Sequence, residues 1–539
     1  MILASYQFNA GDIPVKIEIK TVEGEYVPIY KVSVTGVEKT TELILEKIKS
    51  ELVKEVSLDI KDLRNIKRSA EIRKKFEEKI SFLVKKYFPD ASEKTTRYLA
   101  AYLIQKSIGL GSLDLLIADD NLEEIAINNS EEAVWVYHKK YGWLKTNIKM
   151  ENEDKIYYYA SSIGRRIGRQ ITLLEPLMDA TLETGDRVNA TLEPISTFGN
   201  TITIRKFSRR PWTITDFIAS NTISIEASAL LWLAVQYELS TLISGGTASG
   251  KTSMLNVISN FFPPNQRIIS IEDTREITLP KFLHWVPMTT RLPNPEGKGG
   301  VSMLDLIVNS LRMRPDRIIV GEIRRQREAE VMFEAMHTGH SVYATVHANN
   351  TKETIVRLTN PPINIPKTML PAISLIVVQY RNRRVGYRRT FQVAEILPDG
   401  DARVLMQWNA KKDRLEKVAR SVNLMNTLET YTGYTRNEIQ KDLIEKGKVL
   451  KWLVKHKVNN IHDVGYVMAE YYTNKKKLMD YVNKNKPIKF KAPEQRVPEE
   501  GKKKRVKKRE PAVKKVMRRF KKVMPKKRRA SPARRKKSK

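Results

Sequence analysis

The sequence predicts an α/β fold in which helices cover a parallel sheet, and three observations favour it. Between residues 212 and 350, short apolar runs typical of buried strands alternate with helical patterns. One of these runs, Leu242-Ile243, leads into a glycine-rich loop over residues 245–252, and a helical pattern follows directly. Other runs end in acidic or histidine side chains. Strand, loop and helix in this order are what a doubly wound parallel sheet requires.

Length and composition limit the possible architectures. A chain of 539 residues is too long for one hydrophobic core, so we expect three or four domains. The absence of cysteine excludes disulfides, cysteine-ligated zinc and iron–sulfur clusters, and it favours a reducing cytosol. The first residues lack the pattern of a signal peptide, and no apolar run is long enough to span a bilayer. We therefore expect a soluble protein that can dock at a membrane.

The net charge of +35 is unevenly distributed along the chain. Residues 501–539 hold 22 Lys and Arg against one acid, Glu510, which leaves +14 for the rest of the chain. From residue 488 onward, Pro, Lys, Arg and Glu dominate, so residues 488–539 are predicted to be a disordered basic tail. Such a tail can bind anionic lipid, nucleic acid or an acidic protein, or it can serve solubility alone.

The first two predicted units are an adaptor region and a mixed α/β domain. Residues 1–94, the N-terminal adaptor region, begin with alternating apolar and polar positions typical of short strands and continue as a charged helical pattern. Residues 95–211 open with a helix and continue with short strands, two of which carry Arg187 and Arg205. These arginines either are solvated at a strand edge or act in trans on the γ-phosphate of a nucleotide.

The glycine-rich loop Gly245-Gly-Thr-Ala-Ser-Gly-Lys-Thr252 fits the phosphate-loop pattern G-x-x-x-x-G-K-[ST]. Its glycines let consecutive backbone N–H groups point at phosphate oxygens, while Lys251 reaches the β- and γ-phosphates and Thr252 ligates Mg²⁺. A plain glycine-rich turn is the alternative. The predicted nucleotide-binding residues are Gly245, Gly246, Thr247, Ala248, Ser249, Gly250, Lys251, Thr252 and Ser253.

Three further apolar runs end in Glu272 and Asp273, in Glu322 and in His347. In an open α/β sheet, ligands bind beyond the carboxyl ends of the strands, so these side chains are expected at one edge. Two carboxylates there meet the needs of hydrolysis, because one can orient the attacking water while the other holds Mg²⁺ through its water shell. His347 is then placed to sense the γ-phosphate.

Two further sets of residues have open roles. A zinc site at His337, His340 and His347 would need a fourth ligand from elsewhere, and the spacing does not match a helical metalloprotease pair. Several arginines either face the nucleotide of a neighbouring subunit or are ordinary surface charges. They are Arg312, Arg314, Arg324 and Arg325.

The remaining body of the chain contains a nucleotide domain followed by helices. Residues 212–414 hold the phosphate loop and the three acidic or histidine-ended runs. Residues 415–487 are predicted to be helical, with amphipathic patterns over 435–445, 449–458 and 461–483.

Together these motifs resemble the secretion and type IV filament ATPase superfamily, in particular its archaeal branch, which includes the archaellum motor and pilus assembly ATPases. The resemblance covers residues 95–410. It rests on residues 245–252 as the Walker A motif, 271–276 as the Asp box, 311–322 as an atypical Walker B motif and 338–347 as the His box. The lack of cysteine matches the archaeal branch, because bacterial assembly ATPases often carry a tetracysteine zinc element.

The resemblance implies a RecA-like P-loop nucleotide domain preceded by a PAS-like mixed α/β domain, with ATP and Mg²⁺ bound. Glu272 is then the catalytic glutamate, Glu322 lies on the Mg²⁺ side, and the arginine fingers Arg187 and Arg205 swing onto the nucleotide. It also implies a homohexamer at the cytoplasmic face of the membrane that acts on a membrane-embedded platform protein, with filament regulatory proteins as further partners. A conjugation-type transfer ATPase, or a nucleic-acid-binding protein that acts through the basic tail, is the alternative.

Overall fold

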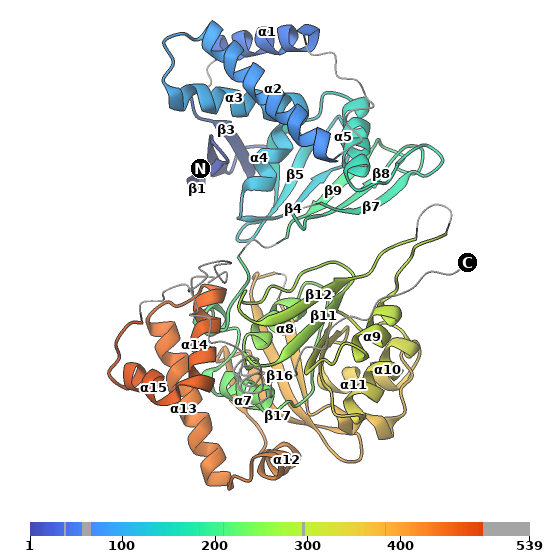
Figure 1. Cartoon of the computed structure of the whole chain (residues 1–539), viewed down its shortest axis with the longest axis vertical. Helices are drawn as coiled ribbons and strands as arrows, with labels where there is room; N and C mark the ends of the chain where they lie inside the picture. Colours follow the sequence, from blue (N-terminus) through green and yellow to red (C-terminus); the bar gives the residue numbers. More distant parts are fainter. Residues whose placement is uncertain are drawn as a thin grey trace, which may run out of the picture. The chain divides into compact units, whose positions relative to one another are not determined.

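The computed structural model describes residues 1–36, 39–55, 66–182, 184–207, 210–293, 297–382 and 384–488 (Figure 1). These residues fall in the unit Met1–Ile488. The predicted disordered tail lies outside the described residues except for its first position, Ile488. No helix among the described residues is both long and apolar enough to cross a membrane.

The first sheet contains nine strands within the described ranges, in the order β1-β2-β3-β6-β5-β4-β9-β8-β7. Neighbouring strands are antiparallel except for β3 and β6, which are parallel. The strands are β1 (Ile2–Ala10), β2 (Ile13–Lys20), β3 (Ile29–Val34), β4 (Leu122–Ile127), β5 (Ala133–His138), β6 (Gly142–Lys149), β7 (Leu177–Thr181), β8 (Arg187–Thr191) and β9 (Thr201–Arg205). The accompanying helices are α1 (Lys39–Glu55), α2 (Ile66–Tyr87), α3 (Glu93–Ile108), α4 (Ser112–Ala118) and α5 (Glu153–Arg166).

Strand β2 shows why these residues form a sheet with one buried face. Ile13, Val15, Ile17 and Ile19 are buried, whereas the residues between them are partly exposed, as the two-residue period of a strand requires. The same hydrophobic core continues through the sheet to Ile204 in β9. The predicted boundary between residues 94 and 95 therefore falls within one continuous sheet and core.

The second sheet has nine strands in the part of the chain that is described, in the order β12-β11-β13-β14-β10-β15-β16-β17-β18. The first six strands in this order, from β12 through β10 to β15, run parallel to their neighbours, whereas β16, β17 and β18 each pair antiparallel with the strand before them. The strands are β10 (Thr241–Gly245), β11 (Arg267–Glu272), β12 (His284–Thr289), β13 (Arg317–Val320), β14 (Ser341–Val346), β15 (Leu375–Arg381), β16 (Arg388–Ile396), β17 (Ala402–Asn409) and β18 (Arg414–Lys417).

Helices cover this second sheet and explain its hydrophobic strands. Every residue of β10, β13 and β14 is buried, as is typical of parallel strands with both faces covered. The helices are α6 (Ile214–Ala219), α7 (Ile225–Gln236), α8 (Lys251–Ser259), α9 (Met303–Leu311), α10 (Gln326–His337), α11 (Thr351–Thr359) and the 3₁₀ helix η2 (Lys367–Ala372). The predicted α/β class with a parallel nucleotide-domain sheet is confirmed.

The C-terminal region is helical, as predicted, but its helices are divided differently. They are α12 (Asn423–Thr432), α13 (Arg436–Lys455), α14 (Ile461–Thr473) and α15 (Lys475–Asn483). The patterns over 435–445 and 449–458 form one continuous helix, because the intervening Lys446 is buried and pairs with Asp442 one turn earlier (2.5 Å). The pattern over 461–483 is interrupted at Asn474, where α14 ends and α15 begins.

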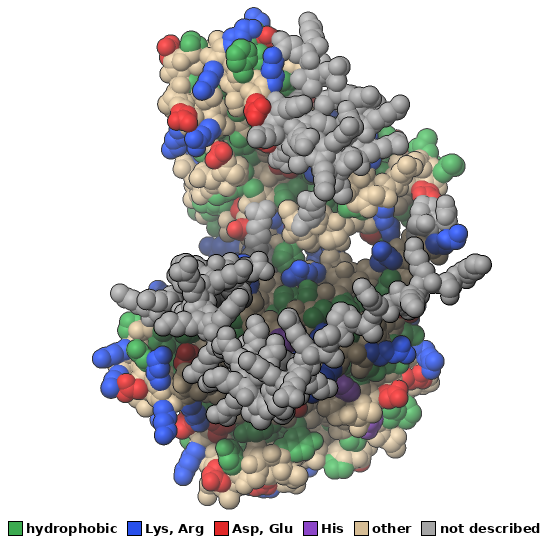
Figure 2. Space-filling view, viewed as in Figure 1, with side chains coloured by type: hydrophobic (Ala, Val, Ile, Leu, Met, Phe, Trp, Pro, Cys, Tyr) green, Lys and Arg blue, Asp and Glu red, His purple; other side chains and the backbone are tan. Residues whose placement is uncertain are grey.

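The surface of the described residues carries both signs of charge. On the face shown in Figure 2, Lys and Arg side chains are interspersed with Asp and Glu side chains. This agrees with a chain whose excess of positive charge resides mainly in residues 501–539.

Candidate active site

The phosphate loop joins the carboxyl end of β10 to the amino end of α8. Gly245 has φ +153° and Gly250 has φ +96°, conformations that favour glycine. A Cβ at Gly245 would lie 2.4 Å from Ser249 Oγ and 2.5 Å from the backbone oxygen of Gln379, so no larger residue fits there. Ser249 Oγ also donates to the Gly246 carbonyl oxygen (2.8 Å). The sequence thus builds a tight backbone turn at the start of a helix, as an anion site needs.

Lys251 and His347 meet at this loop. Lys251 is 8% exposed, and its Nζ donates to the Gly246 carbonyl oxygen (3.0 Å) and lies 3.2 Å from His347 Nδ1. Burial lowers the pKa of Lys251 to about 8. Burial, followed by the Lys251 charge, also lowers the pKa of His347. His347 Nε2 in turn lies 3.2 Å from Glu322 Oε1, so these three side chains form one connected chain of contacts.

Glu272 lies at the carboxyl end of β11, as predicted. It is 2% exposed, and its Oε1 accepts the backbone N–H groups of Glu276 (2.9 Å) and Ile277 (3.0 Å). Its other oxygen, Oε2, is buried and has no hydrogen-bond partner. Burial raises the pKa of Glu272 from 4.5 to about 7, against the opposing effect of the two backbone donors. The carboxyl group is therefore held in place by one oxygen and keeps an unused acceptor.

Arg324 joins the two acidic strand ends. Its guanidinium contacts Glu322 Oε2 (2.8 Å) and Asp273 Oδ2 (2.5 Å). The sequence alone left open whether Arg324 faces another subunit or solvent, and the structure places it against two acids of its own chain. This clamp fixes the carboxyl ends of β11 and β13 relative to each other.

Arg187 and Arg205 lie opposite each other on the neighbouring strands β8 and β9. An Arg187 amino nitrogen lies 3.8 Å from Glu276 Oε1, and Arg187 Nε is buried without a hydrogen-bond partner. Burial is the main cause of the lowered pKa of Lys251, and the charge of Arg205 lowers this pKa further. The two arginines thus lie side by side on adjacent strands of the first sheet.

Arg388, which sequence reasoning missed, also contacts the phosphate loop. It begins β16, and its Nε donates to the Ala248 carbonyl oxygen (3.0 Å). One of its amino nitrogens lies 3.7 Å from Glu123 Oε2 in β4. Local patterns in the sequence carry no signal for this contact, because 140 residues separate Arg388 from Ala248.

Several other candidates lie away from these contacts. His340 precedes β14 and His337 ends α10, so both are at the opposite end of β14 from His347. Within the residues that the structure describes, no three His, Asp or Glu side chains are grouped to hold a metal ion. Arg312 and Arg314 lie between α9 and the amino end of β13, opposite the end that leads to Glu322. Arg325 is the N-cap residue of α10.

A phosphate loop at the carboxyl edge of a parallel sheet, with buried acidic and basic side chains beside it, defines a P-loop nucleotide-binding domain. The family described as "Type II/IV secretion system protein" matches residues 127–420. This match spans more than half of the chain, and the chain belongs to that family. The predicted membership in the secretion and type IV filament superfamily is confirmed.

The chain is also similar to individual proteins. An uncharacterized protein of Methanocaldococcus jannaschii is 36% identical over 385 residues, which cover 69% of this chain and 69% of the relative. A putative conjugal transfer protein of Mycobacterium tuberculosis is 28% identical over 334 residues, covering 59% of this chain and 94% of the relative. Among solved structures, the ATPase DotB of Legionella pneumophila is 20% identical, with coverage of 63% and 91% and a TM-score of 0.39.

Proposed function

We propose that this chain hydrolyses ATP to ADP and phosphate and converts the hydrolysis into movement of a type IV filament or related secretion machine. The observation that carries the proposal is the cluster at one sheet edge. Lys251, His347 and Glu322 form successive contacts of 3.2 Å, and Glu272 ends the parallel strand β11 beside β13. A phosphate-binding lysine and two carboxylates are the groups that phosphoryl transfer to water needs.

The residues of the loop fit a nucleotide with Mg²⁺. The close packing at Gly245 admits no side chain at that position, and the free Oε2 of Glu272 is an acceptor that the protein itself does not use. Thr252 would hold Mg²⁺ directly and Glu322 through water. The ion would supply positive charge that offsets the charge of the phosphates.

Each of the clustered side chains has a distinct role in this proposal. Lys251 binds the phosphates, and Glu272 orients the attacking water and accepts its proton. Because its pKa is near 7, Glu272 is poised between its protonated and charged forms at neutral pH, as suits a general base. His347 connects Lys251 to Glu322, so it is placed to sense the γ-phosphate.

Arg187 and Arg205 are proposed to complete the site when residues 95–211 close on residues 212–414. Guanidinium groups stabilise the charge that develops on a transferring phosphoryl group. Closure and opening in the subunits of a homohexamer would then convert hydrolysis into displacement. The same proposal assigns an adaptor role to residues 1–94, which share one sheet and core with residues 95–211, and divides the rest into these two domains, a helical region over 415–487 and a basic tail.

The client is proposed to be a membrane-embedded platform protein at the cytoplasmic face of the membrane. The mycobacterial relative, named for conjugal transfer, supports the alternative of DNA or protein transfer. We propose that the basic tail, with its 22 Lys and Arg, contacts anionic lipid, nucleic acid or an acidic protein. Binding of each ligand class to a chain ending at residue 500 tests this role.

Two substitutions at the phosphate loop and β11 test the proposed activity. We expect Lys251→Ala to abolish ATP binding and turnover, and Glu272→Ala to retain binding while turnover falls by roughly 10³-fold. Lys281→Ala is the matched control, because Lys281 is an exposed lysine outside the site. ATP turnover and nucleotide binding are measured on the purified full chain. Unchanged turnover in both site variants would contradict the proposal.

A further inference from the structure

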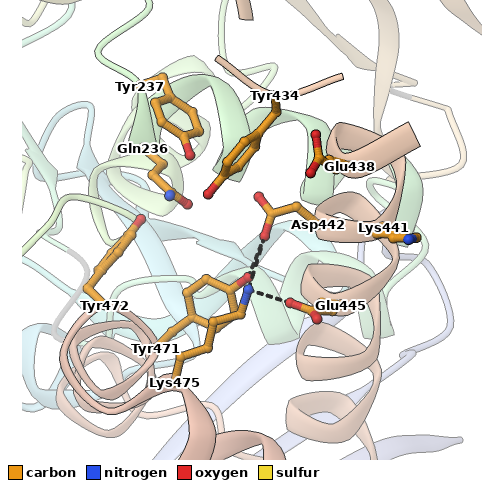
Figure 3. A pocket seen from close by; sticks show the side chains of 10 residues that line it. All are labelled: Gln236, Tyr237, Tyr434, Glu438, Lys441, Asp442, Glu445, Tyr471, Tyr472 and Lys475. Atoms are coloured by element: carbon orange, nitrogen blue, oxygen red, sulfur yellow. Dashed lines mark hydrogen bonds and ion pairs between the residues drawn. The ribbon is translucent and has the colours of Figure 1, made fainter. Parts of the chain in front are cut away.

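A cavity that is open to solvent lies among the C-terminal helices, apart from the phosphate loop (Figure 3). Its volume is about 460 Å³, within the size range of pockets that hold small ligands. It is formed by the end of α7, the turn between α12 and α13, and helices α13, α14 and α15. The residues that line it include Gln236, Tyr237, Tyr434, Glu438, Asp442 and Tyr471.

Carboxylates and phenol groups converge on this cavity. Figure 3 shows the carboxylates of Glu438 and Asp442 and the hydroxyl groups of Tyr237 and Tyr434 directed toward its centre, with Lys441 pointing away. Three acidic residues line the cavity, and one of them, Asp442, already accepts hydrogen bonds from Tyr471 (2.8 Å) and the buried Lys446 (2.5 Å). Asp442 also pairs with Lys475 (3.5 Å), and Glu438 Oε2 accepts from the Thr435 N–H and hydroxyl (2.8 Å each), so the centre is faced by carboxylates and by hydroxyl groups that can donate or accept.

One of these acceptors is unused. The Oε1 atom of Gln236 is buried and has no hydrogen-bond partner. The amide of Gln236 faces the same space as the tyrosine hydroxyls (Figure 3). Since leaving a buried acceptor unpaired costs free energy, a ligand that donates a hydrogen bond here would remove that cost.

The tyrosine rings of this cavity already bind cationic groups of the protein. The ammonium groups of Lys446 and Lys475 lie 4.9 Å and 5.1 Å from the centre of the Tyr471 ring. Lys475 also forms an ion pair with Glu445 (Figure 3). Aromatic rings combined with carboxylates are the usual means by which proteins recognise organic cations.

We propose that this cavity binds an alkylammonium or guanidinium group. The group can belong to a free amine or to a Lys or Arg side chain of a basic protein segment, since both present the same chemistry. Its charge would face Asp442 and Glu438, its N–H groups would donate to Gln236 Oε1, and its alkyl chain would lie against Tyr237 and Tyr434. The proposal does not depend on the proposed ATPase activity.

The cavity wall is bonded to the helix that begins at the phosphate loop. Tyr472, on α14, donates its hydroxyl hydrogen to the Phe261 carbonyl oxygen (2.6 Å) and accepts a hydrogen bond from Trp232 Nε1 (2.8 Å). Trp232 also stacks on Phe261, with ring centres 5.6 Å apart and planes 7° from parallel. Phe261 closely follows α8, whose first residue is Lys251.

Titration calorimetry of the full chain tests this site with defined probes. Agmatine and cadaverine represent free guanidinium and ammonium compounds, the blocked peptide acetyl-Gly-Arg-Gly-amide represents a basic protein segment, and 1,5-pentanediol is the uncharged control. We expect saturable binding of at least one cation and none of pentanediol. Tighter binding of agmatine or cadaverine would identify a free amine as the ligand, and tighter binding of the peptide would identify a protein side chain.

Two substitutions decide whether the binding occurs in this cavity. Tyr434→Ala and Gln236→Leu should weaken binding of the preferred cation about tenfold, the loss of one cation–π contact or one hydrogen bond. Tyr431→Ala is the matched control, since Tyr431 is 64% exposed on α12 and does not line the cavity, whereas Tyr434 is 44% exposed at its rim. Absence of cation binding at millimolar concentration, or equal affinity in Tyr434→Ala, Gln236→Leu and wild type, would overturn the proposal.

Discussion

Replacement of Glu272 by glutamine should separate stability from activity. In the native protein the buried carboxyl binds its proton more tightly than the unfolded chain does, since its pKa rises from 4.5 to about 7. Between these two pH values the free energy of unfolding therefore falls as the pH rises. Above about pH 7 the folded protein bears the full free-energy cost of a buried, ionised carboxylate. The shift corresponds to a cost of ~3 kcal/mol at about pH 8.

Glutamine keeps the acceptor for the Glu276 and Ile277 N–H groups but carries no charge. Its NH₂ group takes the place of Oε2, which has no partner, and an unpaired buried donor costs about 1 kcal/mol. Glu272→Gln should therefore stabilise the protein by about 2 kcal/mol at about pH 8 and by little at about pH 5, while it removes ATP turnover.

Differential scanning calorimetry at the two pH values measures this effect. The expected rise in melting temperature for the transition of the nucleotide domain is about 4–8 °C at the higher pH. Glu334→Gln is the matched control, because Glu334 is an exposed acid on α10. If Glu272→Gln and wild type lose stability equally between the two pH values, the carboxyl does not carry the proposed proton linkage and the reasoning is refuted.

Two further predictions concern the basic side chains near the loop. Arg187→Ala and Arg205→Ala should each lower ATP turnover by roughly 10³-fold and leave ATP affinity nearly unchanged. Arg166 is an exposed arginine outside the site, so Arg166→Ala should change neither quantity. Turnover close to wild type in the first two variants would exclude arginine fingers at these positions. Because the pKa of Lys251 is near 8 without nucleotide, ATP affinity should fall as the pH rises through that value, by at most tenfold per pH unit. In Lys251→Arg, ATP affinity should not change over this pH range. An ATP affinity of the wild type that is independent of pH would contradict the prediction.

Local patterns in the sequence predicted the elements that carry the site. The apolar runs ending at Glu272, Glu322 and His347 became β11, β13 and β14, because buried parallel strands are recognisable from a few consecutive residues. The glycine spacing of the phosphate loop is equally local. The opposition of Arg187 and Arg205 followed from two short strands close together in the sequence.

Contacts between distant residues could not be predicted in this way. Arg324 meets Asp273 across 51 positions, and Arg388 meets Ala248 across 140. The parallel pairing of β3 with β6 likewise joins segments that no periodicity connects. The helical patterns over 435–445 and 449–458 join into the single helix α13, in which the buried Lys446 pairs with Asp442. Such pairs depend on how the chain folds back on itself.

The continuous first sheet gives residues near the amino terminus a mechanical role. β1 and β8 are seven strand spacings apart in this sheet, a span of roughly 30 Å. Hydrogen-bonded strands over a shared core resist shear, so the sheet can act as a lever between β1 at one edge and the pair Arg187 and Arg205 near the other. Under the proposed function, a partner that tilts β1 would displace the arginines, and force would pass in the reverse direction if ATP drew them in.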